Sequence, residues 1–277
     1  MIRNIGLLAA IGGLSLAGTA YAGTPYAGIE GGVSYGRVSD VDEHVSFVAT
    51  QNTSTPAAPA PPAASEFDDV FAVRYDRGYD VGLIGGYDFG YFRLELELAQ
   101  KKARLGNLKS DDITEEFLTS LNSTLNRPSA APDPGAPGQP ALAIDDFDLS
   151  GSMRVRSAMI NGFGDVGITK RLFAYGGGGY GRTWARALGD GDSAWGWQWM
   201  AGLRYALNPK VELGLRYRYF NSGMMTLQRD PQVIAGNANR LTVSATDVDQ
   251  TVNANVIQEI EGEIRSRSLL ATLMFNL

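Results

Sequence analysis

The sequence predicts an all-β fold: an eight-stranded antiparallel up-and-down transmembrane β-barrel with four long extracellular loops. Three observations lead to this prediction. Eight segments alternate between apolar and polar residues, which is typical of strands with two different faces. The connections between them alternate between short and long, as in barrels inserted from one side of a membrane. The chain also contains no cysteine, so its stability has to come from burial and backbone pairing.

The clearest alternation lies in residues 195–220, WGWQWMAGLRYALNPKVELGLRYRYF. Trp197 and Trp199 share one face of the first strand, and Gln198 and Arg204 share the other. The sequence Asn-Pro-Lys at 208–210 predicts a turn, because proline cannot continue a hydrogen-bonded ladder. The return strand repeats the pattern, so the segment is expected to form an antiparallel hairpin.

Six further segments complete the predicted set of strands. Four of them alternate clearly, and one, 149–168, has an unclear register for which we consider a bulge near residues 161–164. The segment rich in glycine, 172–185, contains four consecutive glycines that we expect to relieve crowding inside a narrow barrel. The six segments are 26–37, 71–87, 91–101, 149–168, 172–185 and 263–277.

The connections are predicted to be turns near residues 89, 170 and 209, and loops over 39–70, 103–148, 186–193 and 223–262. The loops carry most of the acidic side chains of a chain whose net charge is −6. Residues 51–65 and 127–141 are rich in proline, alanine and serine. Between them, residues 111–125 place Ile113, Phe117, Leu118 and Leu121 at helical spacing, which predicts a short amphipathic helix or a transient helical turn.

The first 22 residues have the pattern of a secretory signal peptide. A basic residue precedes an apolar run, and Ala20-Tyr21-Ala22 fits a small-x-small cleavage site. We therefore expect cleavage between Ala22 and Gly23, export through the inner membrane, and one barrel domain over residues 23–277. The alternative is an uncleaved membrane anchor, for which the apolar run is short.

The polar face of the predicted strands carries charges of both signs in near balance. If lipid surrounds the apolar face, these charges meet inside an eight-stranded barrel, which is just wide enough for side chains to fill. The alternative is a soluble barrel with the apolar face inside. The predicted lumen charge network consists of Glu30, Arg74, Asp76, Asp80, Arg93, Glu95, Glu97, Arg204, Glu212, Arg216 and Arg218. Aromatic residues near strand ends are expected to form two interfacial girdles: Tyr26, Tyr87, Phe92, Trp195, Tyr217, Tyr219 and Phe275.

Several of these segments resemble a known family. The segments YAGIEGG (26–32), DFG (88–90), YGGGGYG (175–181), AGLRY (201–205) and GLRYRYF (214–220) are together similar to the OmpA-like and opacity-type outer-membrane β-barrels. The resemblance implies periplasmic turns, surface loops, location in the outer membrane of a Gram-negative cell, and roles in envelope integrity, adhesion or slow solute diffusion. In this family the last strand, usually ending in phenylalanine, directs insertion; here it ends Phe275-Asn276-Leu277. We expect no peptidoglycan-binding domain.

The sequence offers little catalytic chemistry, so we expect no enzyme and no cofactor. The single histidine, His44, lies beside Asp42 and Glu43 in a predicted loop, and a lipid-modifying enzyme would require such a histidine as its base. The Asp-x-Asp pairs at 40/42, 190/192 and 247/249 are weak candidates for calcium or magnesium.

The expected function is structural and surface-interactive, with a lumen filled by paired charges; a small-solute diffusion porin is the alternative. The expected partners are outer-membrane lipid and lipopolysaccharide, together with surface ligands bound by 39–70, 103–148 and 223–262. Acidic loops argue against nucleic acid. We expect a monomer.

Overall fold

The computed structural model describes residues 23–52, 57, 59–109, 112–127, 138–147, 151–243 and 245–277. The expected signal peptide, including Ala22, lies outside the described residues, and Gly23 is the first residue within them. Most of the proline-rich segment 127–141 also lies outside them.

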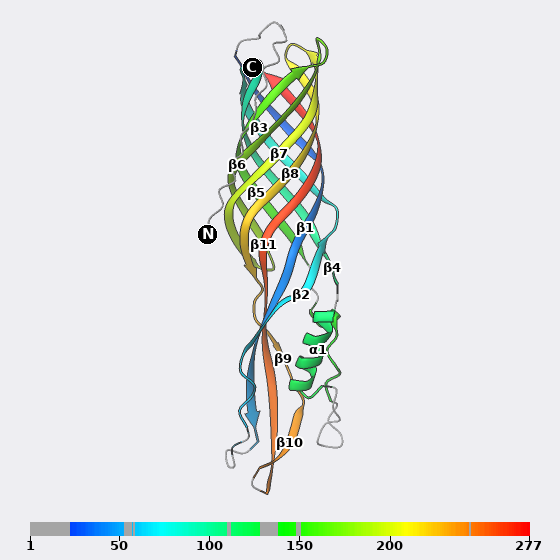
Figure 1. Cartoon of the computed structure of the whole chain (residues 1–277), viewed down its shortest axis with the longest axis vertical. Coiled ribbons are helices and arrows are strands. Elements are labelled where there is room, and N and C mark those ends of the chain that lie inside the picture. The colour runs from blue at the N-terminus through cyan, green and yellow to red at the C-terminus, as the bar shows by residue number, and fades with distance from the viewer. Residues whose placement is uncertain are drawn as a thin grey trace, which may run out of the picture.

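Within the described residues, eight antiparallel strands close a ring, which confirms the predicted barrel (Figure 1). The first and last of them close it, with Tyr26 paired opposite Asn276 and Val33 opposite Leu269. In order around the ring, the strands are β1 (Thr24–Gln51), β11 (Thr246–Asn276), β8 (Val211–Gln228), β7 (Asp190–Asn208), β6 (Leu172–Ala187), β5 (Ser152–Gly167), β4 (Phe92–Lys109) and β3 (Gly78–Asp88).

The two faces of the strands have the predicted orientation. Leu96 is 64% exposed on the outer face, whereas Arg93 and Arg216 are fully buried inside the ring. The alternative of a soluble barrel with its apolar face inside is therefore wrong. Tyr26 differs from the predicted girdle, because it points into the lumen and is only 4% exposed. No helix among the described residues is both long and apolar enough to cross a membrane.

Strand β5 keeps a single register along its length, so the bulge considered near residues 161–164 is wrong. Its odd-numbered residues are buried from Met153 to Asp165, and each residue from Ser152 to Gly164 pairs with β4 without a shift. The neighbouring glycine-rich part of β6 makes this close packing possible. A Cβ atom on Gly179 would lie 1.8 Å from Oδ1 of Asn161, so no larger residue fits beside that inward-pointing amide.

The loop predicted over residues 186–193 is a tight hairpin instead. Strands β6 and β7 remain paired up to Ala187 and Asp190, and only Leu188 and Gly189 connect them. Both residues have positive φ, 59° and 95°, which is the two-residue turn that matches the twist of a hairpin. The loops predicted over 39–70 and 223–262 also differ from the prediction, but there the barrel strands continue beyond the wall.

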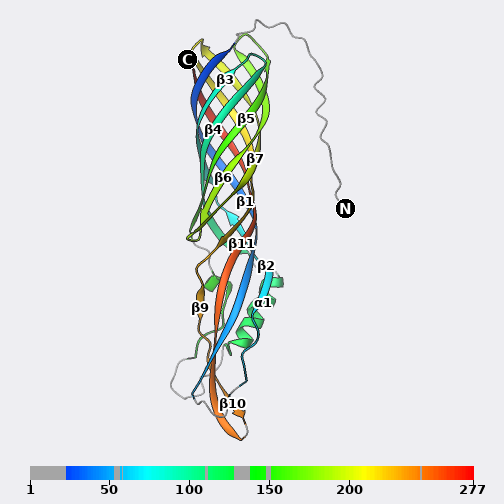
Figure 2. The ribbon, with the colours of Figure 1, turned by 90° about the vertical axis from the view of Figure 1, so that its left-hand side faces the viewer.

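Beyond the barrel, β1 and β11 continue side by side into a narrow projection, which we call the extension (described residues of 42–75, 105–147 and 226–262) (Figures 1 and 2). Strand pairing continues to Gln51 and Gln250, so the loops predicted over 39–70 and 223–262 are largely strand. Strands β2 (Ser65–Tyr75), β9 (Gln232–Ile234) and β10 (Ala238–Val243) pair along them. The 17 residues 246–262 of β11 correspond to roughly 55 Å of strand at about 3.3 Å per residue.

Register shifts mark the boundary between barrel and extension. Pairing of β1 with β11 shifts between Arg37 and Asp42, and pairing of β11 with β8 shifts between Glu263 and Arg265. Gly223, at φ 79°, lies in the second of these irregularities. Such bulges bend strands and change their direction, which here allows β1 and β11 to leave the ring.

The predicted amphipathic helix is present as α1 (Asp112–Thr124), and its apolar stripe packs into the extension. Phe117, Leu121 and Leu125 are almost completely buried, and Asn126, at φ 53°, follows the end of the helix. The short 3-10 helix η1 (Ile144–Phe147) adds the buried side chain of Phe147. Phe71, the first residue of the predicted strand 71–87, joins the same cluster and is 1% exposed.

Candidate functional site

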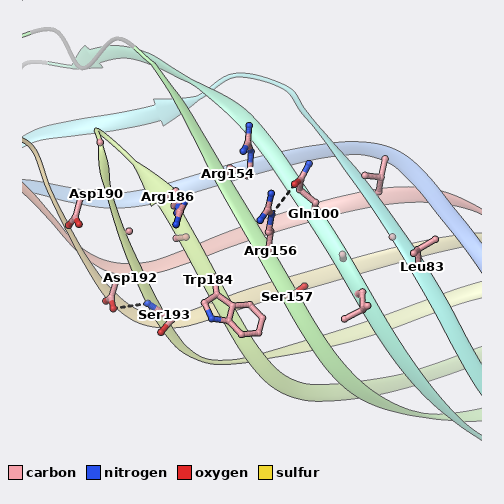
Figure 3. A pocket seen from close by; sticks show the side chains of 17 residues that line it. Leu83, Gln100, Arg154, Arg156, Ser157, Trp184, Arg186, Asp190, Asp192 and Ser193 are labelled. Carbon is pink, nitrogen blue, oxygen red and sulfur yellow. Dashed lines mark hydrogen bonds between the residues drawn. The ribbon is translucent and has the colours of Figure 1, made fainter.

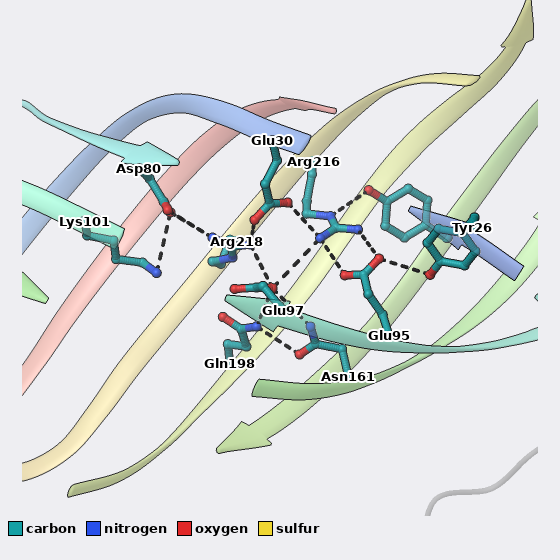
Figure 4. A network of polar contacts seen from close by, with 11 residues as sticks. Tyr26, Glu30, Asp80, Glu95, Glu97, Lys101, Asn161, Gln198, Arg216 and Arg218 are labelled. Atoms are coloured by element: carbon teal, nitrogen blue, oxygen red, sulfur yellow. Dashed lines mark hydrogen bonds and ion pairs between the residues drawn. The ribbon is translucent and has the colours of Figure 1, made fainter. Parts of the chain in front are cut away.

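Two regions of the barrel gather polar side chains. One is a hollow lined by β3, β4, β5, β6 and β7 near the extension end of the barrel (Figure 3). The other is a network of ion pairs inside the barrel, contributed by strands from around the ring (Figure 4). The network is described first, because it contains most of the charged residues singled out from the sequence.

Arg216 of β8 connects two carboxylates in the middle of the lumen. Its guanidinium donates to Glu95 through two nitrogens, at 2.9 and 3.1 Å, and to Glu30 at 2.9 Å. Its Nε donates to the hydroxyl of Tyr175 at 3.1 Å, while Tyr26 donates to Glu95 at 3.1 Å. The side chains of Arg216, Glu30 and Glu95 are fully buried. The bidentate contact with Glu95 fixes the orientation of both the guanidinium and the carboxylate.

Arg218, two residues along β8, extends the network toward the extension. Its guanidinium donates to both oxygens of Asp80, at 3.1 and 3.0 Å, lies 2.9 Å from Glu97, and also donates to Glu30. Lys101 lies 3.7 Å from Asp80. In this central group, four carboxylates therefore surround three cations: Glu30, Asp80, Glu95 and Glu97 around Lys101, Arg216 and Arg218.

Two neutral amides fill the remaining space beside Glu97. Asn161 and Gln198 donate to the same carboxylate oxygen, at 3.0 and 2.9 Å, and Gln198 also donates to Asn161 at 2.9 Å. Because all these groups are buried, each hydrogen bond offsets the cost of removing a charge from water.

A second group of charges lies at the end of the barrel that carries the short turns. Arg93 donates to Asp165 at 2.7 Å, and its guanidinium lies 4.9 and 5.0 Å from the ring centres of Tyr175 and Phe163. Arg204 pairs with three carboxylates: Asp88 at 3.0 Å, Glu212 at 3.1 Å and Asp165 at 3.2 Å. Asp165 thus links the two arginines.

On the extension side, the polar network meets apolar side chains. The ammonium group of Lys101 lies 4.1 Å from the ring centre of Phe220, which is completely buried. Phe220 and Met159 belong to the apolar cluster that continues into the extension as far as Phe117 and Phe147. From the short-turn end toward the extension, the interior is therefore filled by paired charges and, beyond them, by packed apolar side chains.

Nine of the predicted network residues lie in these two groups. Asp76 does not, because the chain leaves the strand pattern in the link between β2 and β3, where this residue is exposed. The backbone of Arg74 pairs with that of Arg37, and its side chain lies outside the described part of the structure. The structure adds Tyr26, Lys101, Asn161, Asp165 and Gln198 to the network. Lys101 and Gln198 continue the inward alternation of their strands, so strict register counting would have found them.

The candidate catalytic and metal residues are placed outside this network. His44 lies in the extension, with its nitrogens 3.7 Å from Glu66 and 3.5 Å from Glu259. Asp190 and Asp192 accept hydrogen bonds from the backbone amides of Gln228 and Thr226, at 3.1 and 2.9 Å. Among the described residues, no group of three or more His, Cys, Asp or Glu side chains is arranged to hold a metal ion.

The chain is similar, at low identity, to three solved structures. Neisserial surface protein A shares 12% identity, with 92% of this chain and 99% of that chain covered at a TM-score of 0.41. OprG of Pseudomonas aeruginosa shares 14% identity, with coverage of 92% and 97% and a TM-score of 0.42. Ail of Yersinia pestis, solved in complex with the heparin analogue sucrose octasulfate, shares 11% identity, with coverage of 89% and 99% and a TM-score of 0.29.

The comparison of the sequence with protein families is the decisive one. No curated protein matches the sequence. A family model described as the outer membrane protein beta-barrel domain matches residues 6–255, which is most of the chain. The chain therefore belongs to the outer membrane protein β-barrel family and is a protein of the outer membrane.

Proposed function

We propose that this protein is a non-enzymatic outer-membrane barrel whose lumen is closed and whose extension acts at the cell surface. The observation that carries the proposal is the continuous filling of the interior. Paired charges around Arg204, Arg216 and Arg218 are followed by the apolar cluster around Phe220. An aqueous path would require these buried ion pairs to separate, which costs several kcal/mol for each uncompensated charge.

The extension is the part proposed to contact partners. It contains most of the described residues of the proposed contact segments 39–70, 103–148 and 223–262, and it lies at the end of the barrel opposite the short turns (Figure 2). In the proposed orientation these turns face the periplasm, and the extension projects through the lipopolysaccharide layer. The proposed protein is a monomer, and the closed ring supports this because none of its strands offers an unpaired edge to the barrel of a second chain.

Cysteine labelling tests whether the lumen is closed, since the chain has no cysteine of its own. An Asn161→Cys variant places a thiol in the middle of the network, and an Arg186→Cys variant places one at an exposed position on the wall. We expect a water-soluble maleimide to label the second thiol and not the first, and planar bilayers containing the parent protein to show no current above background. Labelling of both thiols together with steady conductance would favour the diffusion porin.

A second experiment addresses the enzymatic alternative. His44, with Glu66 and Glu259 beside it, is the histidine that a lipid-modifying activity would require. We expect purified lipid to remain unchanged after incubation with either the parent protein or a His44→Ala variant. Modification by the parent that is lost in the variant would contradict the proposal.

A further inference from the structure

A cluster of six cations lies on the barrel wall near the extension. It consists of Lys102 and Arg104 on β4, Arg154 and Arg156 on β5, and Arg182 and Arg186 on β6. Pairing places Lys102 directly opposite Arg154, and Arg154 directly opposite Arg186. These side chains occupy the strand positions that alternate with the buried ones, so they project outward.

Half of the cluster lines the hollow of Figure 3, whose volume is about 1180 Å³. Arg154, Arg156 and Arg186 line it together with the apolar side chains of Leu98 and Trp184. Figure 3 shows the three arginines on two neighbouring strands, with Trp184 on the same strand as Arg186. A ligand in this hollow would meet positive charge and apolar surface together.

Two carboxylates, Asp190 and Asp192, line the same hollow, so the positive charge of the six cations is only partly balanced. Among the ion pairs formed by described residues, none includes any of the six cations. Arg156 donates to the amide oxygen of Gln100 at 3.1 Å, and Arg182 donates to the hydroxyl of Ser193 at 2.6 Å. The nearby Asp190 and Asp192 instead accept from backbone amides of β8. By contrast, the exposed Arg265 lies 2.6 Å from Glu263.

The position of the cluster along the barrel axis indicates the type of ligand. Toward the short turns, the outer face carries Leu98 and Trp195 in one pairing row and Leu96, Ile160, Tyr180 and Trp197 in the next, all of them exposed. Such an apolar and aromatic face is what contacts lipid chains and the membrane interface. The three arginines of the hollow begin where this face ends, which is where lipid headgroups are expected, while Arg182 lies one row further toward the short turns.

We propose that this hollow binds the phosphate groups of a lipopolysaccharide molecule of the outer leaflet, with its acyl chains along the adjacent apolar wall. The proposal rests on the orientation given under the proposed function, with the extension toward the cell surface. Guanidinium groups suit phosphate because they donate several hydrogen bonds in a fixed plane. Three arginines from adjacent strands match a ligand that carries more than one phosphate.

The test uses the folded protein in phosphatidylcholine nanodiscs, titrated with bis-phosphorylated lipid A, with bound lipid counted by native mass spectrometry. The variant Arg154→Gln/Arg156→Gln/Arg186→Gln removes three charges from the hollow. The matched control Lys170→Gln/Arg171→Gln/Lys210→Gln removes three exposed charges from the short-turn end. We expect the first variant to bind lipid A at least about tenfold more weakly, as loss of charge-assisted hydrogen bonds implies, and the control to bind like the parent.

Several outcomes would overturn the proposal. Equal affinity of parent and hollow variant would exclude the site, and equal weakening by the control would show a general effect of charge. Undiminished binding of dephosphorylated lipid A would exclude phosphate recognition, and displacement of lipid A by inorganic phosphate at equal concentration would assign the hollow to the free ion. A folded band that shifts on boiling checks that each variant is intact. Protease treatment of whole cells tests the orientation separately, because nanodiscs present both ends of the barrel.

Discussion

Replacing Arg216 by methionine tests the contribution of the buried network to stability. The variant loses three hydrogen bonds to Glu30 and Glu95 and one to the hydroxyl of Tyr175, and it leaves two carboxylates without their shared cation. Removing one partner of a buried pair costs about 3–5 kcal/mol. We expect this loss in the free energy of unfolding, because the carboxylates can take up protons and so avoid a larger penalty.

Urea unfolding in phosphatidylcholine vesicles, followed by tryptophan fluorescence, measures this effect. The matched control is Arg265→Met, which breaks an equally close ion pair with Glu263 at an exposed site and should cost no more than about 1 kcal/mol. Adding Glu95→Gln to Arg216→Met should recover part of the loss, because one buried charge is removed. If Arg216→Met unfolds within about 0.5 kcal/mol of the parent, the network does not stabilise the barrel as argued here.

Two further predictions concern the extension. Burial raises the pKa of Glu43 to about 8 although Gln258 donates to it at 2.8 Å, so the folded state holds a proton that the unfolded state releases near its ordinary value of 4.5. The contribution of this proton to the free energy of unfolding of the extension should be fully present below about pH 4.5 and fall by about 1.4 kcal/mol per pH unit toward pH 8. Hydrogen exchange measures this slope, and Glu43→Gln should abolish it. Phe117→Ala should destabilise the extension by about 3–5 kcal/mol, while the barrel still shows its heat-shifted band. Ile113→Ala, at an exposed position of the same helix, should have little effect. Equal resistance of the two variants to protease would contradict this prediction.

The barrel could be predicted from the sequence because lipid and lumen impose opposite requirements on successive residues. Leu96 and Glu97 are adjacent in the chain and lie on opposite sides of the wall, one exposed and one buried. Strand β5 also has two different faces, but near the extension Met153, Val155 and Met159 point inward while Arg154 and Arg156 point outward. There the inner face is apolar and the outer face charged, which reverses the usual pattern and explains why its register was unclear.

The extension could not be predicted from the sequence, because its strands lack one apolar and one polar face. Its strands contact their own apolar cluster on one side and water on the other, and they include a buried carboxylate at Glu43 and buried amides at Gln250 and Gln258. Such a mixed face has the composition of a loop. The hairpin at Leu188–Gly189 was missed because leucine rarely adopts a positive φ, so the turn has only one residue that suggests it.

The pairing of β1 with β11 has a consequence for the order of assembly. Each rung of this seam joins residues far apart in sequence, from Tyr26 with Asn276 in the wall to Gln51 with Gln250 near the tip. Contacts of such long range form slowly, because a large loop must close before they contribute. Neither the barrel wall nor the extension is complete until β11 has paired with β1. We therefore expect the barrel and the extension to close together in one late step of folding.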